Sequence, residues 1–111
     1  MDDCIFCKIA AHQIPSTVVY EDDKVIAFDD LAPQAPVHTL VIPKDHYANI
    51  IDGVPADVLA AMVNAVSEVA RAEGLDDGFR VIANTGEVAG QTVHHFHMHV
   101  LGGKPLGENL V

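Results

Sequence analysis

The sequence contains no tryptophan, and aromatic residues make up only 5% of its 111 positions. Positive charge is also scarce, because six lysines and arginines stand against sixteen aspartates and glutamates, a formal net charge of −10. Binding to nucleic-acid backbones and to anionic membrane surfaces is largely electrostatic and needs positive charge. We therefore expect an aliphatic core and no nucleic-acid or membrane partner, whereas a single small anion needs only local donors.

Long hydrophobic runs are absent as well, since no segment approaches the ~20 continuous apolar residues that cross a bilayer. The first residues, Met1 to Asp3, are acidic and lack the basic-then-apolar order of a signal peptide. We therefore expect a cytoplasmic protein. Half of the residues are apolar and the length suits one folding unit, so residues 1–111 are predicted to form a single domain.

Periodicity and turn residues predict a short helix, a long helix and five strands. The expected helices cover residues 4–12 and 55–73, and the expected strands cover 17–21, 24–28, 38–42, 79–83 and 94–101. One long helix cannot cover both faces of a parallel sheet. The fold class is therefore predicted to be α+β, with an antiparallel sheet of about five strands, one long helix and a short N-terminal helix.

The long helix has clear signals at both of its ends. Pro55 suits the first helical turn, Asp52 is the expected acid at the N-terminus, and Gly74 is the expected stop. Its apolar residues fall on one stripe, made of Val58, Met62, Ala65, Val66 and Val69. Further alanines and valines give this helix more apolar surface than it needs to cover one sheet. We therefore predict a homodimer with twofold symmetry.

Seven histidines are an excess for this length, and four of them fall between positions 94 and 99. Because side chains alternate along a strand, His95, His97 and His99 are expected on one face, opposite apolar neighbours. Three readings fit such a row: solvated polar residues, a catalytic zinc site with one open position, or a nucleophilic imidazole oriented by its neighbours.

The polar loop before this strand favours the nucleophile. Gly90, Gln91 and Thr92 offer neutral donors that hold phosphate oxygens without lysines. A zinc hydrolase would more usually add a carboxylate base beside the metal, and none adjoins the histidines here. The pattern therefore indicates phosphate chemistry at an imidazole.

The segment from Gly90 to Leu101 resembles the signature of the histidine triad (HIT) family, His-φ-His-φ-His-φ-φ, where φ is apolar. Similar matches extend over essentially all of residues 4–103, including Cys4–Ile9, Ile14-Pro15, Val19–Asp22, Ala27–Asp30 and Pro33–Lys44. The resemblance is to the Hint branch, whose members are homodimeric nucleoside phosphoramidate hydrolases. It implies a HIT-like fold and one HIT domain over residues 1–111.

The resemblance also implies a covalent mechanism. His97 would attack the α-phosphorus of a purine nucleoside phosphoramidate or acyl-nucleotide, and water would release the nucleoside monophosphate from the nucleotidyl-histidine. His99 would bind phosphoryl oxygens and assist proton transfer, His38 would orient the triad, and Thr92 would complete the catalytic set. No metal would be required for catalysis.

The remaining nucleotide-binding residues are implied in the same way. Ile5, Phe6, Phe28 and Leu31 would enclose the base, Asp30 would accept the ribose hydroxyls, and Asn84, Gly90, Gln91 and Thr92 would hold the phosphate end. An apolar wall beside one acid is also what a nucleoside pocket needs. Two departures concern the leaving group: Thr92 stands where the family often has serine, and the tail after Gly103 is short, polar and without tryptophan.

The two cysteines, Cys4 and Cys7, form a Cys-x-x-Cys pair, a spacing typical of metal or redox chemistry in a reducing compartment. We predict that they hold a structural zinc together with His46 and His95, since four protein ligands leave no open position. Small apolar packing residues and a redox pair are the alternative interpretations. For the whole protein, the alternatives are a dinucleoside polyphosphate hydrolase and a non-catalytic, zinc-stabilised nucleotide-binding adaptor.

Overall fold

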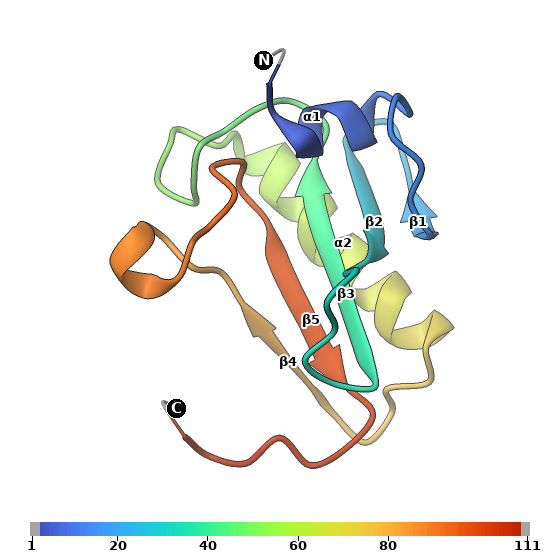
Figure 1. The fold of residues 1–111 in the computed structure, drawn as a ribbon. Helices are drawn as coiled ribbons and strands as arrows, with labels where there is room; N and C mark the ends of the chain where they lie inside the picture. Colours follow the sequence, from blue (N-terminus) through green and yellow to red (C-terminus); the bar gives the residue numbers. More distant parts are fainter. Residues whose placement is uncertain (1–2, 110–111) are drawn as a thin grey trace.

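A computed structural model describes residues 3–109, and the five strands within it form one antiparallel sheet of order β1-β2-β3-β5-β4 (Figure 1). The elements are α1 (Ile5–Ala10), β1 (Val18–Glu21), β2 (Val25–Asp29), β3 (Val37–Pro43), α2 (Ala56–Ala72), β4 (Phe79–Ile82), the 3-10 turn η1 (Glu87–Ala89) and β5 (Met98–Gly102). The predicted α+β class is therefore confirmed. The predicted domain boundaries, 1 and 111, lie outside the described residues.

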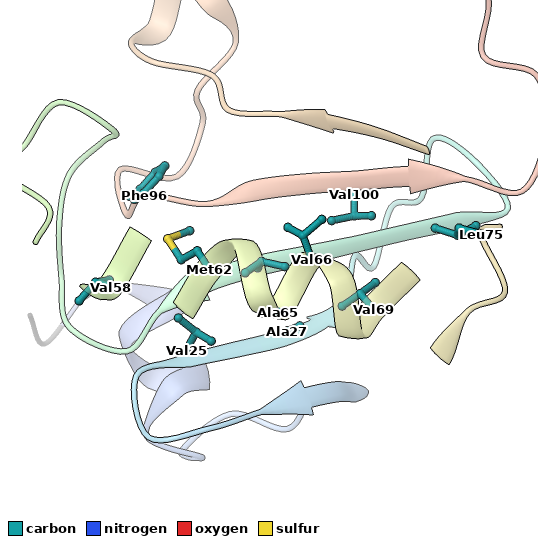
Figure 2. Packing of buried hydrophobic residues seen from close by; sticks show 11 residues of the cluster. Val25, Ala27, Val58, Met62, Ala65, Val66, Val69, Leu75, Phe96 and Val100 are labelled. Carbon is teal, nitrogen blue, oxygen red and sulfur yellow. The ribbon is translucent and has the colours of Figure 1, made fainter. Parts of the chain in front are cut away.

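Helix α2 runs across one face of the sheet (Figure 1). The five residues of its predicted apolar stripe are all buried. Figure 2 shows the stripe facing Val25 and Ala27 of β2 and Val100 of β5, with Phe96 at one end of the cluster. Sheet residues at every second position meet helix residues spaced three or four apart, which is how the two periodicities build one core.

The opposite face of the sheet is also apolar at its centre, which the sequence analysis did not predict. Ile26 and Phe28 of β2, and Leu40 and Ile42 of β3, point away from α2 and pack with α1. Strands buried on both faces appear in a sequence as continuous apolar runs, and residues 25–28 and 40–42 are such runs. This second layer places α1 on the histidine-bearing side of the sheet.

The ends of α2 differ in part from the prediction. Pro55 is the N-cap, with extended backbone angles, and so lies one residue before the helix. Asp52 lies before the helix, where it accepts a hydrogen bond from the Ala48 N–H at 2.7 Å. The acid in the first turn of the helix is Asp57. Gly74 follows the helix with a φ of +67°, as expected for a left-handed stop.

Over residues 3–109, neither helix has the length and apolar content needed to cross a bilayer.

The last strand begins at Met98 and ends at Gly102, so the predicted range 94–101 was wrong at its start. The partner strand explains the difference. Pro43 at the end of β3 has no N–H, and its carbonyl accepts a hydrogen bond from the His95 side chain at 2.8 Å. The Phe96 N–H instead donates to the Tyr47 carbonyl. The predicted alternation survives, because Phe96 and Val100 are buried with α2 while His97 and His99 lie on the other face.

Candidate functional site

A cavity of about 250 Å³ lies on the histidine-bearing face, and most of its surface is apolar. It brings together eight residues predicted for nucleotide binding: Ile5, Phe6, Phe28, Asp30, Leu31, Thr92, His97 and His99. Seven other lining residues were not predicted from the sequence: Ile9, Ile14, Pro15, Ser16, Asp29, Leu40 and Val93. The missed residues carry no chemical signal in the sequence, since only the packing of α1 and its following loop against the sheet places them here.

A larger hollow of about 580 Å³ lies between the 74–80 turn and residues 103–106. It contains none of the predicted catalytic or binding residues. We therefore take the smaller cavity, which holds the imidazoles, as the candidate active site.

His97 is buried beside this cavity with its ring held in one orientation. Its Nδ1 donates a hydrogen bond to the main-chain carbonyl of His95 at 2.7 Å, which leaves the lone pair on Nε2. The Phe6 ring meets it edge to face, with ring centroids 5.1 Å apart. Burial lowers the pKa of His97. The imidazole is therefore neutral at neutral pH and nucleophilic at Nε2.

His99 is linked to His38 on the neighbouring strand β3. The His38 Nε2 lies 2.8 Å from the His99 Nδ1 and 3.4 Å from a carboxylate oxygen of Asp30. On its other side, the His38 Nδ1 accepts a hydrogen bond from the Gln34 N–H at 3.0 Å. Burial, followed by the nearby charges of His97 and His38, lowers the pKa of His99 to about 4. The structure thus places His38 behind His99, away from the cavity.

The loop before the histidines is held together by its own hydrogen bonds. The Gln91 side chain is 3% exposed and donates to the carbonyls of Ala48 and Val93, and it accepts from the Gly86 N–H. The N–H groups of Gly90 and Gln91 donate to carbonyls within the same turn. Gly90 and Gln91 therefore shape the loop in this structure. Of the three loop residues predicted to hold phosphate, Thr92 is the one that lines the cavity.

Asn84 is half-buried just after β4 and does not line the cavity. Its predicted contact with the phosphate end of a nucleotide, like those of Gly90 and Gln91, stays a prediction.

The four predicted metal ligands form one cluster, in which a ligand atom from each lies within 4.8 Å of all the others. The His95 Nδ1 lies 3.4 Å from the Cys4 Sγ and 3.5 Å from the Cys7 Sγ, and the His46 Nδ1 lies 3.4 Å from the Cys7 Sγ. Tetrahedral zinc with ordinary bond lengths separates a thiolate sulfur and an imidazole nitrogen by about 3.5 Å. The donors therefore stand at the spacing that zinc requires.

Two further observations show that these residues fit a metal ion. The His95 Nε2 donates to the Pro43 carbonyl, so its Nδ1 presents a lone pair toward the two sulfurs, the arrangement typical of metal-bound histidine. Burial and the adjacent Cys4 raise the pKa of the Cys7 thiol to about 11. The Cys7 thiol therefore resists ionisation without a cation, and a bound metal ion reverses that preference.

The model of the HIT domain family matches residues 11–106 of the chain. The purine nucleoside phosphoramidase of Escherichia coli is 45% identical over 113 aligned positions, which cover 98% of this chain and 94% of that protein. A 14 kDa zinc-binding protein of Brassica juncea is also 45% identical, with 94% of this chain and 96% of that protein covered. The solved structure of a HIT family hydrolase from Clostridium thermocellum superposes with a TM-score of 0.94 at 45% identity, covering 100% of this chain and 99% of that one.

Proposed function

The chain belongs to the HIT domain family, and on that premise we propose that it is a hydrolase of purine nucleoside phosphoramidates or acyl-nucleotides that releases a nucleoside monophosphate. The observation that carries the proposal is the orientation of His97. Its Nδ1–H is bound to the His95 carbonyl, and its ring lines a nucleoside-sized apolar cavity. The phosphoramidase named in Escherichia coli supports the substrate class.

The proposed reaction has two displacements at one phosphorus atom. The lone pair of the His97 Nε2 forms a bond to the α-phosphorus, and the bond to the leaving nitrogen or oxygen breaks with its electron pair. The leaving atom gains a proton from solvent when it is an amine, whereas an acyl carboxylate leaves as the anion. Water then attacks the phosphorus, the electron pair of the nitrogen–phosphorus bond returns to Nε2, and the water's proton goes to solvent.

The cavity supplies binding for the nucleoside. Phe6 and Phe28 offer apolar surface to a purine, and their rings stand edge to face with centroids 5.6 Å apart. Asp30 accepts one hydrogen bond from the Ala32 N–H and has acceptor capacity left for ribose hydroxyls. Thr92 and His99 line the same cavity, and in this proposal they donate to phosphoryl oxygens.

The second part of the proposal concerns Cys4, Cys7, His46 and His95, which would hold a structural zinc ion. Such an ion supplies no reaction step, because four protein ligands occupy all four tetrahedral positions. Its effect is to tie α1 to the sheet, and the zinc-binding relative from Brassica juncea supports this assignment.

The decisive experiment replaces the nucleophile. His97→Ala should lower turnover of a fluorogenic adenosine phosphoramidate by several orders of magnitude, because covalent catalysis has no substitute for the attacking nitrogen. The melting temperature should change little, since His97 packs outside the main apolar core between α2 and the sheet. Mass spectrometry of rapidly quenched wild-type protein should detect the nucleotidyl adduct on His97.

A variant that keeps more than about a tenth of wild-type turnover would remove His97 from this role. A wild-type protein that binds adenosine monophosphate but turns over no phosphoramidate would instead favour the non-catalytic adaptor. Faster turnover of a dinucleoside polyphosphate than of the phosphoramidate would favour that substrate class.

A further inference from the structure

We propose that the main-chain N–H of Gln34 is a positioning group for catalysis, which fixes the tautomers of His38 and His99 so that His99 presents an Nε2–H to the substrate. The proposal rests on the proposed function, because it assigns a task to His99 in that reaction. The group lies in the loop between β2 and β3, which carries the predicted nucleoside-binding residues Asp30 and Leu31 but none of the predicted catalytic side chains.

The position of a main-chain amide hydrogen is certain. The Gln34 N–H can only donate, so the His38 Nδ1 at 3.0 Å must carry the lone pair. Neutral His38 therefore has its hydrogen on Nε2, which donates to the His99 Nδ1 at 2.8 Å. His99 must then carry its own hydrogen on Nε2, the ring nitrogen that is left for the cavity.

The same contact decides between two roles for a second cluster of ligand-type atoms. Asp30, His38 and His99 place an oxygen and two nitrogens within 4.8 Å of one another, as a divalent metal site would. A metal on the His38 Nε2 would need the hydrogen on Nδ1, where it would oppose the Gln34 N–H. His95 shows the opposite arrangement: its Nε2 donates to the Pro43 carbonyl, so its Nδ1 keeps the lone pair that a metal ion needs. The cluster is therefore a hydrogen-bond chain.

The loop that carries Gln34 is itself tied down by bonds that do not involve the Gln34 side chain. The Ala32 N–H donates to the Asp30 side chain at 2.9 Å. The Asp30 N–H donates to the His38 carbonyl at 2.9 Å, which anchors the loop to β3. The Gln34 N–H is thus held in register with the ring that it orients.

In the proposed reaction, the hydrogen bonds from Gln34 through His38 make His99 a fixed neutral donor. An Nε2–H aimed at the reacting phosphoryl group stabilises negative charge that develops there, without a change in the protonation of His99. His97 is set in the reverse sense, because its Nδ1 is bound to a carbonyl and its Nε2 keeps the lone pair. His97 therefore acts as the nucleophile because its Nδ1 meets a main-chain carbonyl. His99 acts as the donor because its partner His38 meets a main-chain N–H.

A direct test is nitrogen NMR of the wild-type protein labelled at histidine. At neutral pH the spectrum should show His38 and His99 neutral, each with its hydrogen on Nε2, and His97 with its hydrogen on Nδ1. A hydrogen on the His38 Nδ1 would overturn the proposal. This readout does not depend on turnover, so it stands or fails separately from the proposed function.

The matched variants are Gln34→Pro, which removes the N–H, and Gln34→Ala, which keeps the N–H and removes only the exposed side chain. Gln34→Pro should slow single-turnover formation of the nucleotidyl adduct roughly ten- to a hundredfold, whereas Gln34→Ala should match wild type within about twofold. The dissociation constant for adenosine monophosphate should stay within about twofold in both. Equal adduct-formation rates in Gln34→Pro and wild type would refute the proposal while leaving the proposed function intact. An equal fall of both variants would also refute it, because the side chain would then be responsible.

Discussion

Main-chain groups set the roles of three buried histidines, His38, His95 and His97. A carbonyl meets the Nε2 of His95, another meets the Nδ1 of His97, and an N–H meets the Nδ1 of His38. Imidazole is donor at one nitrogen and acceptor at the other when neutral, so each contact decides the chemistry of the remaining nitrogen. Identical side chains therefore differ in what they offer: the His95 Nδ1 keeps a lone pair toward the cysteines, the His97 Nε2 keeps a lone pair, and the His38 Nε2 is left to bond His99.

Asp30 should contribute specificity for the ribose. Asp30→Asn should weaken binding of adenosine monophosphate roughly tenfold, because a hydrogen bond to a charged acceptor is worth about 1.5–3 kcal/mol. Binding of 2′-deoxyadenosine monophosphate should change much less. Titration calorimetry with both nucleotides checks the expectation, and an equal loss for the two would place Asp30 away from the 2′-hydroxyl.

The lowered pKa of His99 predicts how its contribution to stability depends on pH. Its pKa in the folded protein is lowered to about 4, chiefly by burial, against about 6.5 in an unfolded chain. Between these values the unfolded chain binds a proton that the native protein does not. The contribution of His99 to the free energy of unfolding should therefore fall as the pH drops from about 6.5 to about 4, and this contribution should level off below that range.

Urea unfolding of wild type and His99→Asn at about pH 7 and about pH 4.5 measures this dependence. The variant should lose less stability over the interval than wild type does. If the two lose the same amount, other groups, such as His95 and His97, whose pKa values are also lowered by burial, account for the dependence.

At the scale of elements, α1 is the most dependent part of the fold. It spans six residues, too few for a stable isolated helix in water. Phe6, Ile9 and Ala10 pack it on the sheet, and Cys4, its N-cap, and Cys7 belong to the predicted zinc site. Since Ile5, Phe6 and Ile9 also line the cavity, the predicted zinc site and the proposed nucleotide pocket share one short helix.

Replacing both cysteines should therefore affect stability and binding together. Cys4→Ser with Cys7→Ser should lower the melting temperature and weaken adenosine monophosphate binding, while a measurable turnover remains because His97 is untouched. Lys8→Ser, in the same helix, should change none of these quantities. Metal analysis of wild-type protein purified without added zinc should find about one equivalent per chain. Metal-free native protein, or loss of turnover on chelation with unchanged stability, would contradict a structural zinc.

At the scale of the whole molecule, the sheet has two free edges, β1 and β4, among the described residues. β1 pairs with β2 through an irregular register between Val18 and Tyr20, a feature that blunts an edge. β4 pairs regularly with β5 and leaves Phe79 and Val81 about two-fifths exposed. We therefore expect the predicted homodimer to join at β4, which would extend the sheet across the twofold axis.

Light scattering at micromolar concentration should give about twice the chain mass of 11.9 kDa. Val81→Lys should shift the protein toward the monomer, because it places a charge at the proposed interface. Val18→Lys is the matched control on β1, since Val18 is 41% exposed and Val81 is 42% exposed. A monomeric wild type would exclude the dimer, and dissociation by Val18→Lys alone would move the interface to the other edge.

Features that depend on local periodicity and residue chemistry could be predicted from the sequence alone. The stripe of α2, the stop at Gly74 and the alternation that separates His97 from Phe96 follow from repeats of 3.6 and two residues. Eight residues of the cavity wall and the members of the Cys-His cluster were likewise predicted, from residue type and from resemblance to a family, whereas the other seven lining residues were not. The periodic signals require only a few neighbouring positions.

The contacts between individual atoms of those residues depend on the packing of segments that are distant in the sequence. The register of β3 against β5 pairs Leu40 with His99, and it brings His38 within 2.8 Å of a residue 61 positions later. The burial of both faces of the sheet and the late start of β5 at Met98 also arise from partners distant in sequence. A hydrogen bond depends on tenths of an ångström between separate segments, and such distances are set by packing, which no local pattern encodes.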